Sequence, residues 1–228
     1  HGRECLWRKY GLAHAINVGD YLSTMSHDIF CDVESTVGTE TFTRAYAIFR
    51  QATLDVLHGQ YLDMYFETEP EVSLSSYLEM IRLKTSRLIS ASLRIGAALA
   101  GCDSSTDSIM EKIGEHAGLA FQIQDDYLGI WGDTSNTGKS NLTDLTTRKK
   151  TYPILLGLIK APAFRNAWFA NSEITPELAR NLTAMLSDSQ VDEQTTEAVL
   201  KHISLIKDGE KELSCSHADS TADLWALV

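Results

Sequence analysis

Hydrophobic residues recur along most of the chain at steps of three and four, which is the period of one face of an α-helix. The first run, between Phe42 and Met64, predicts a long amphipathic helix. A second run follows Pro70 and stops before Gly101, and Ser73 is placed to act as its N-cap. Two long helices are therefore expected in the first half of the chain.

The same reading extends to the C-terminal half. Residues Asp103–Asp107 supply turn and cap residues before a helix expected over 108–131, and residues 132–143 are rich in Gly, Asn, Ser and Thr, which is typical of a loop. Further helices are expected to start at Pro153, after Thr175 and after Asp192. No sustained alternation with period two and no glycine-rich strand-to-helix turn occurs, so the predicted fold class is all-α.

Two glycines lie inside these helical runs. Glycine costs about 1 kcal/mol relative to alanine in a helix interior. Gly59 and Gly96 therefore indicate places where helices pack closely.

Composition narrows the class of protein. The 228 residues are 43% hydrophobic and 22% charged, as in an ordinary globular protein. A formal net charge of -11 argues against a nucleic-acid partner, since binding a phosphate backbone requires clustered Lys and Arg. Any anionic ligand must be held locally, by a few lysines or by metal ions.

The chain shows no sign of a metal-binding cysteine motif or a membrane span. Its four cysteines have no CxxC or Cys/His spacing, so we expect buried, reduced thiols in a cytoplasmic protein rather than a zinc site or a disulfide framework. The most apolar tract, around residues 154–170, is interrupted by Lys160 and Arg165, too soon for a membrane-spanning helix.

The most informative local feature is a pair of carboxylates, Asp125 and Asp126, inside an apolar helical pattern. Burial of an unpaired carboxylate costs several kcal/mol, so both are expected to face water, a cation or a metal-bound substrate. Gln122, Gly129 and Asp133 fall on the same side of the helix. Oxygen ligands of this kind suit Mg²⁺, although a solvated acidic face with Asp133 at the helix end explains the spacing equally well.

Lysines follow this acidic helix. Lys139 and Lys149 lie just downstream, and Lys84-Thr85 occupies the middle of an earlier apolar helix. Acidic residues followed by basic ones suggest a clamp for a metal and a diphosphate. Taken alone, each lysine is more often a surface residue extending from a packed helix.

Several motifs, in order, resemble one family, the trans-isoprenyl diphosphate synthases or polyprenyl synthetases. The similar segments, over roughly residues 1 to 160, are AINVGD at 15–20, Gly59-Gln60 with Asp63, Lys84-Thr85 with Leu88, FQIQDD at 121–126, Gly138-Lys139, Asp144-Leu145, and Lys149 with Thr151 and Pro153. The resemblance implies an isoprenoid synthase-type helical bundle around a central cavity, in a single domain over residues 1–228.

The resemblance also implies a function. The expected enzyme is a prenyltransferase that condenses an allylic diphosphate with isopentenyl diphosphate to a longer trans-polyprenyl diphosphate, with Mg²⁺-dependent ionisation of the allylic substrate. We expect a cytoplasmic homodimer. The implied catalytic residues are Lys84, Thr85, Gln122, Asp125 and Asp126; the substrate-binding residues are His1, Lys84, Thr85, Gln122, Lys139 and Lys149; and the metal ligands are Asp125 and Asp126.

This chain departs from the family pattern at three points. The second aspartate-rich motif usually reads DDxxD, but Gly129 occupies its last position; Asp133 is either a replacement or a structural residue. His1 stands where the family commonly has an arginine that binds isopentenyl diphosphate. The first aspartate-rich motif normally precedes His1, so we expect the sequence to lack N-terminal helices, and product length is not readable from it.

Two alternatives remain open. A terpene cyclase on the same fold would ionise an allylic diphosphate without a second substrate. A non-catalytic partner subunit of a prenyl synthase would bind a catalytic homologue instead.

Overall fold

A computed structural model describes residues 3–132 and 142–216, with side chains as far as residue 213. These residues form helices and turns and contain no strand, as predicted. The elements are α1 (Leu6–Tyr10), α2 (Leu12–Val37), α3 (Thr39–Thr68), α4 (Leu74–Ile81), the π-helix η1 (Arg82–Ser86), α5 (Arg87–Leu99), α6 (Ser104–Trp131), α8 (Thr143–Thr146), α9 (Tyr152–Lys160), α10 (Pro162–Ala170), α11 (Pro176–Asp188) and α12 (Val191–Ser216).

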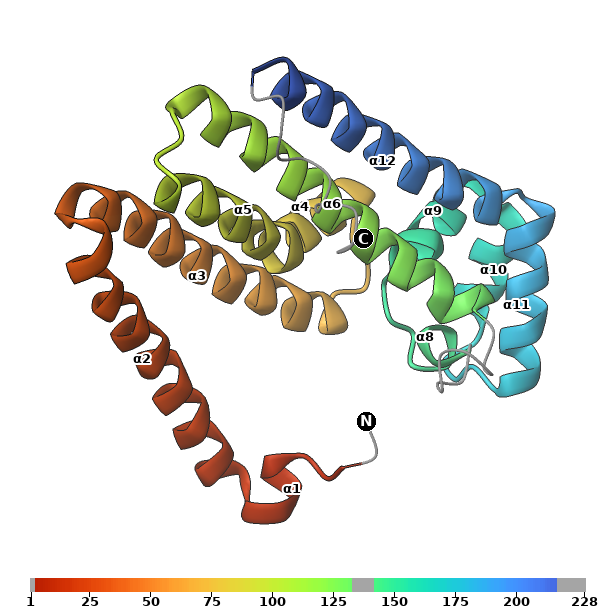
Figure 1. Cartoon of the computed structure of the whole chain (residues 1–228). Helices are drawn as coiled ribbons and strands as arrows, with labels where there is room; N and C mark the ends of the chain where they lie inside the picture. The colour runs from red at the N-terminus through yellow and green to blue at the C-terminus, as the bar shows by residue number, and fades with distance from the viewer. Residues whose placement is uncertain (1–2, 133–141, 217–228) are drawn as a thin grey trace.

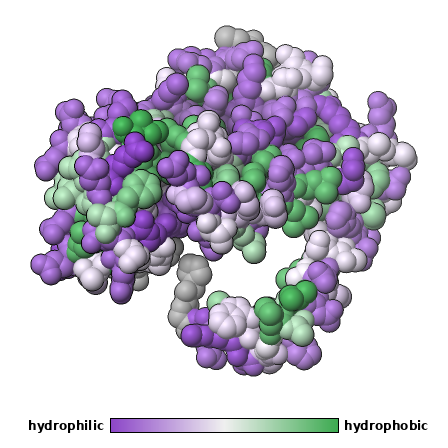
Figure 2. All heavy atoms as spheres, turned by 180° about the vertical axis from the view of Figure 1, so that it is seen from behind, coloured by the Kyte–Doolittle hydropathy of each residue, from purple (hydrophilic) through white to green (hydrophobic). Residues whose placement is uncertain are grey.

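Helix α6 runs through the middle of the bundle (Figure 1). It packs against α5 on one side and α12 on the other, and α3 packs against α5 and η1. The short helices α8 to α11 gather around the C-terminal end of α6. Helices α1 and α2 form an arm that leaves the start of α3 and stands away from the bundle (Figures 1 and 2).

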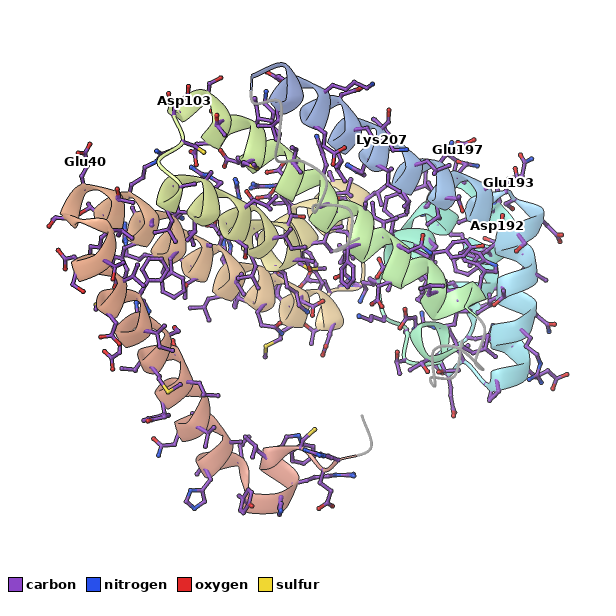
Figure 3. All side chains as sticks on the ribbon, in the orientation of Figure 1. Glu40, Asp103, Asp192, Glu193, Glu197 and Lys207 are labelled. Carbon is purple, nitrogen blue, oxygen red and sulfur yellow. The ribbon has the colours of Figure 1, made fainter. Side chains whose placement is uncertain are left out.

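Three predicted helix caps are confirmed, although α6 begins at Ser104, four residues before the predicted start at residue 108. The side chains of Ser73, Asp103 and Thr175 each accept a hydrogen bond from the first turn of the helix that follows. Asp192 is the exception, because α12 already begins at Val191 and Asp192 lies in its first turn. Glu193 lies in the same first turn, where negative charge complements the helix dipole, and Figure 3 shows both residues at this end of α12 with Glu197 further along the helix.

Small residues allow α6 to approach the neighbouring helices closely. A Cβ atom added at Gly114 or Gly118 would lie 2.3 Å from the Cα of Ser90 or Ser86, respectively. The prediction for Gly59 is confirmed, because its added Cβ would lie 2.4 Å from the backbone nitrogen of Lys84. The prediction for Gly96 is wrong, since a Cβ built there would meet no atom within 4 Å apart from its own stretch of helix.

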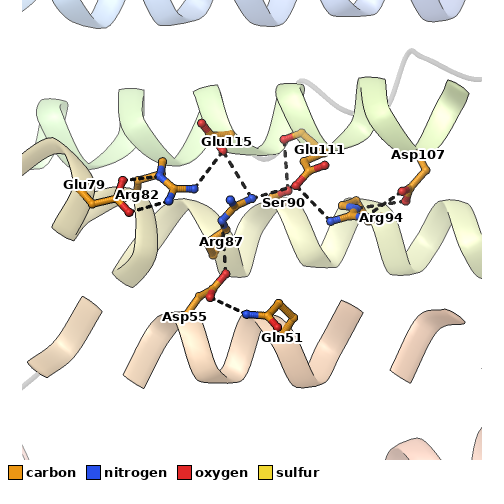
Figure 4. Close-up of polar contacts among 10 residues, drawn as sticks. All are labelled: Gln51, Asp55, Glu79, Arg82, Arg87, Ser90, Arg94, Asp107, Glu111 and Glu115. Atoms are coloured by element: carbon orange, nitrogen blue, oxygen red, sulfur yellow. Dashed lines mark hydrogen bonds and ion pairs between the residues drawn. The ribbon is translucent and has the colours of Figure 1, made fainter. Parts of the chain in front are cut away.

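An arginine network also joins α3, α5 and α6 (Figure 4). Arg87 contacts Asp55 of α3 at 3.4 Å and Glu111 of α6 at 2.9 Å, and Arg94 contacts Asp107 of α6 at 2.9 Å. Hydrogen-bonded pairs that include guanidinium groups are stronger and more directional than neutral ones. The network therefore fixes the position of α6 along α5, the helix that follows η1.

Two further predictions concern a membrane span and the cysteines. Within the described ranges, no helix is both long enough and apolar enough to span a membrane. Cys5, Cys31 and Cys102 are free thiols, but Cys5 and Cys31 are exposed, so the expectation that they are buried is wrong.

Candidate functional site

A π-helical turn places Lys84 against α3 and Thr85 against α6. The turn, η1, lies between α4 and α5, and the backbone of Lys84 approaches α3 where Gly59 leaves room for it. A π-turn inside a longer helix often marks a functional position, because it changes the direction of the side chains on it. The sequence predicted a continuous helix here and gave no signal for the π-turn.

The ammonium group of Lys84 is held by a carboxylate of α3. Its Nζ lies 2.5 Å from Oδ2 of Asp63, and both side chains are mostly but not fully buried. Asp63 also lines a cavity of about 490 Å³. A partly exposed lysine beside a cavity can bind an anion without any large rearrangement.

This cavity lies between α3, α4 and the segment after α8. Its lining residues are Asp63, Phe66, Glu67, Thr68, Met80, Thr147, Arg148, Lys149 and Lys150. The Nζ of Lys150 donates to the backbone oxygen of Phe66 at 2.7 Å, and burial lowers the pKa of this lysine. The segment that carries the cations is thereby fastened to the C-terminal end of α3.

The cationic segment has a second anchor at Arg148. Its backbone adopts φ 55°, which is uncommon for a residue with a side chain. The guanidinium donates to the carbonyl oxygens of Asn171 at 2.8 Å and Trp168 at 3.1 Å, and it lies 4.4 Å from the centre of the Trp168 ring. These contacts hold the backbone that presents Lys149.

A chain of hydrogen bonds links η1 to the acidic part of α6. Thr85 Oγ1 donates to Oε1 of Gln122 at 3.0 Å, and Gln122 Nε2 donates to Oδ1 of Asp126 at 3.3 Å. The other carboxylate oxygen of Asp126 accepts the hydroxyl of Tyr77 and, at 3.0 Å, the backbone N–H of Tyr152. Asp126 thus connects α4, α6 and the first turn of α9.

Asp126 is 2% exposed, so the expectation that it faces water is wrong. Burial raises its pKa to about 6, against the opposing effect of the hydrogen bonds from Tyr152, Tyr77 and Gln122. Burial and the neighbouring carboxylate raise the pKa of Tyr77 well above its usual value. The three donors explain how a carboxylate can lie inside the apolar helix pattern.

Asp125, the adjacent residue, is exposed. Successive helix positions differ by about 100°, so one carboxylate turns inward and the other outward. Within the described residues, His, Cys, Asp and Glu side chains form no group of three that could hold a metal ion. A metal at Asp125 would therefore need ligands from elsewhere, such as water or a phosphate.

The predicted site residues separate into four sets. Thr85, Gln122 and Asp126 lie in one hydrogen-bonded chain, with Lys84 next to Thr85 on η1, while Asp125 lies on the neighbouring exposed face. Lys149 lines the cavity and is close enough to Asp126 to lower its pKa. His1, Asp133 and Lys139 lie outside the described residues.

Sequence reasoning missed the partners of the buried carboxylate. The hydroxyl of Tyr77 is bonded to Asp126, which lies 49 residues further along the sequence. Tyr152 contributes a backbone N–H, which any residue could supply. The one available signal was the cost of burying Asp126, which demands partners without saying where they are.

Comparison with known proteins agrees with this architecture. The family described as polyprenyl synthetase matches residues 1–197. A geranylfarnesyl diphosphate synthase of Aeropyrum pernix is 40% identical over 153 residues, covering 67% of this chain and 48% of the relative. A (2E,6E)-farnesyl diphosphate synthase of Mycobacterium tuberculosis is 39% identical over 153 residues, 67% of this chain and 41% of the relative.

Solved structures give the same result. A polyprenyl synthetase from Streptomyces coelicolor superimposes with a TM-score of 0.83 at 30% identity, covering 91% of this chain and 63% of that one. The chain spans about half the length of the curated relatives it matches.

Proposed function

Because the chain belongs to the polyprenyl synthetase family, we propose that it is a prenyltransferase that lengthens an allylic diphosphate with isopentenyl diphosphate. The observation that carries this proposal is the hydrogen-bonded chain from Thr85 through Gln122 to Asp126, with Lys84 beside it. In this arrangement the ammonium group of Lys84 can bind the leaving diphosphate. The oriented amide of Gln122 can stabilise positive charge on the carbon from which the diphosphate departs. An unrelated helical core would need neither.

Lys84 and Lys149 are proposed to bind the diphosphate of the allylic substrate. Lys84 is held by Asp63, and Lys149 by the anchored segment around Arg148, so both cations are positioned before substrate arrives. Fixed cations stabilise charge that develops on a leaving diphosphate without reorganising during the reaction. Lys139 is proposed to bind the same diphosphate, and His1 to contact isopentenyl diphosphate.

The acidic face of α6 fits Mg²⁺. Asp125 offers exposed carboxylate oxygens, the hard donors that Mg²⁺ prefers, and this ion keeps several waters and commonly shares phosphate oxygens. Bound there, Mg²⁺ would neutralise negative charge on the departing diphosphate. We propose Asp125 as the residue of this chain that holds it.

Asp126 is proposed to position Gln122 rather than to bind the metal directly. Its carboxylate fixes the amide NH₂ of Gln122, so the amide oxygen turns toward Thr85. A carbonyl oxygen held in this direction stabilises positive charge as the allylic C–O bond breaks. The double bond of isopentenyl diphosphate then forms the new C–C bond, and a proton leaves to the released diphosphate.

Incubation of the protein with Mg²⁺, an allylic diphosphate and labelled isopentenyl diphosphate tests the proposal. We expect label in a longer prenyl diphosphate. Hydrocarbon released from the allylic substrate alone, without label, would identify a terpene cyclase. No turnover alone, with turnover restored by an added homologue, would identify a partner subunit.

We further propose a homodimer, on the family resemblance. Sedimentation of the purified protein at twice the mass of one chain is the expected result.

A further inference from the structure

The turn that follows α8 ends this helix in a pattern that usually contains glycine. The N–H of Arg148 donates to the carbonyl oxygen of Leu145 at 3.0 Å, and the N–H of Lys149 donates to that of Asp144 at 2.9 Å. These two bonds define a Schellman cap, in which the first of the two donor residues adopts a left-handed conformation. Arg148 does so, with φ 55°, although a residue with a Cβ costs free energy there relative to glycine.

The side chain of Arg148 makes contacts that glycine could not make. Its guanidinium donates to the carbonyl oxygens of Trp168, in the last turn of α10, and of Asn171, the residue that ends α10. Carbonyl groups at the C-terminal end of a helix have no partner within the helix, and a cation is favourable there. The guanidinium also lies against the ring of Trp168, which is 3% exposed. Arg148 therefore joins the turn after α8 to the C-terminal end of α10.

Lys149 lies between two anchored residues. Arg148 is held by α10, and the ammonium group of Lys150 donates to the carbonyl oxygen of Phe66 near the end of α3. Lys149 itself lines the cavity and is close enough to Asp126 to lower the pKa of that carboxyl group. The place of the Lys149 ammonium group is thus set by contacts on both sides of it, and α10 supplies those on one side.

We propose that Arg148 is a positioning residue for prenyl transfer, which ties Lys149 to the C-terminal end of α10. This assignment rests on the proposed function, in which Lys149 binds the allylic diphosphate. Arg148 and Trp168 act without contacting the substrate, and α10 influences the reaction through the placement of one ammonium group. A cation that is already in place does not have to be ordered when the diphosphate binds, and ordering a long side chain costs affinity.

The binding of inorganic pyrophosphate in the presence of Mg²⁺, measured by isothermal titration calorimetry, tests the proposal. Arg148→Gly keeps the left-handed turn, since glycine is the usual residue at this position of a Schellman cap, and removes the contacts with α10. It is expected to weaken binding roughly 2- to 10-fold, the cost of ordering a side chain that is no longer held. Lys149→Ala removes the ammonium group itself and is expected to weaken binding roughly 10- to 100-fold.

A double-mutant cycle shows whether Arg148 acts through Lys149. In the Lys149→Ala background there is no ammonium group to place, so Arg148→Gly should change the affinity by less than about 2-fold. Arg165→Ala is the control for the loss of a cation, because Arg165 is an exposed residue of the same helix α10. Its replacement should leave pyrophosphate binding unchanged.

Arg148→Lys separates positioning from the loss of a charge. Lysine keeps the positive charge but lacks the planar fork that reaches two carbonyl groups and stacks on an aromatic ring. Its affinity for pyrophosphate should lie between those of wild type and Arg148→Gly. If the glycine variant does not fold, Arg148→Lys takes its place in the cycle.

Three results would contradict these expectations. Equal affinity of Arg148→Gly and wild type would overturn the role of Arg148. An equal loss of affinity in the wild-type and Lys149→Ala backgrounds would also overturn it, because Arg148 would then act independently of Lys149. Wild-type protein that binds no pyrophosphate in the presence of Mg²⁺ would instead overturn the proposed function itself.

Discussion

Replacing Tyr77 with Phe removes one hydroxyl from the buried carboxylate that orders the site. The ring remains and still fills its space in the core, where Tyr77 is 2% exposed. What is lost is the hydrogen bond from the Tyr77 hydroxyl to Asp126, which keeps its other two donors. A hydrogen bond to a charged group contributes about 1.5–3 kcal/mol, so Tyr77→Phe should lower the free energy of unfolding by about 2 kcal/mol.

The assay is urea unfolding at pH 7.5, followed by circular dichroism. We expect a lower midpoint with an unchanged slope, because the surface exposed on unfolding is the same. Tyr61→Phe is the matched control; Tyr61 is 63% exposed, and its replacement should change stability by less than about 0.5 kcal/mol. Equal stability of Tyr77→Phe and wild type would refute the claim that this bond stabilises the buried carboxylate.

Further predictions concern packing and pH. Gly59→Ala should destabilise the protein by about 1–3 kcal/mol, because its Cβ would collide with the backbone of Lys84. Gly96→Ala adds a Cβ that meets no neighbour, so it should be neutral or stabilising. Thermal unfolding checks both variants. Burial and the nearby His116 lower the pKa of His202 to about 4. The unfolded chain then binds a proton that the folded chain does not, so stability should fall as pH drops from about 6.5 toward 4. In urea unfolding at pH 5, His202→Gln should reduce this loss of stability by about 1 kcal/mol, a small value because the ring is half exposed. An unchanged pH dependence would contradict the lowered pKa of His202.

The helices were predictable because their periodicity and caps are local in the sequence. Ser73, Asp103 and Thr175 act within three residues of themselves, and the structure agrees with each. The π-turn at Lys84 was not predictable, since it depends on the approach of Gly59 from another helix.

Asp125 is exposed and Asp126 is buried, and this difference was not predictable from the sequence either. Periodicity placed both on one broad face, but only the position of Tyr77 and of the first turn of α9 decides which carboxylate is buried. The departure from the family pattern at Gly129 was visible in the sequence. The sequence did not show that the carboxylate of Asp144, from the short helix α8, lies where a side chain at position 129 would be.

The exposed carboxylate of α6, Asp125, is proposed to hold Mg²⁺ during prenyl transfer. The most direct test of this role is the rate of isopentenyl diphosphate incorporation by Asp125→Asn relative to Asp208→Asn, a change at a 61% exposed side chain of α12. Metal stabilisation of a departing diphosphate is worth several kcal/mol, so Asp125→Asn should lower kcat/KM by at least about 100-fold. Asp208→Asn should match wild type. Equal activity of the two variants would contradict a metal-binding role for Asp125.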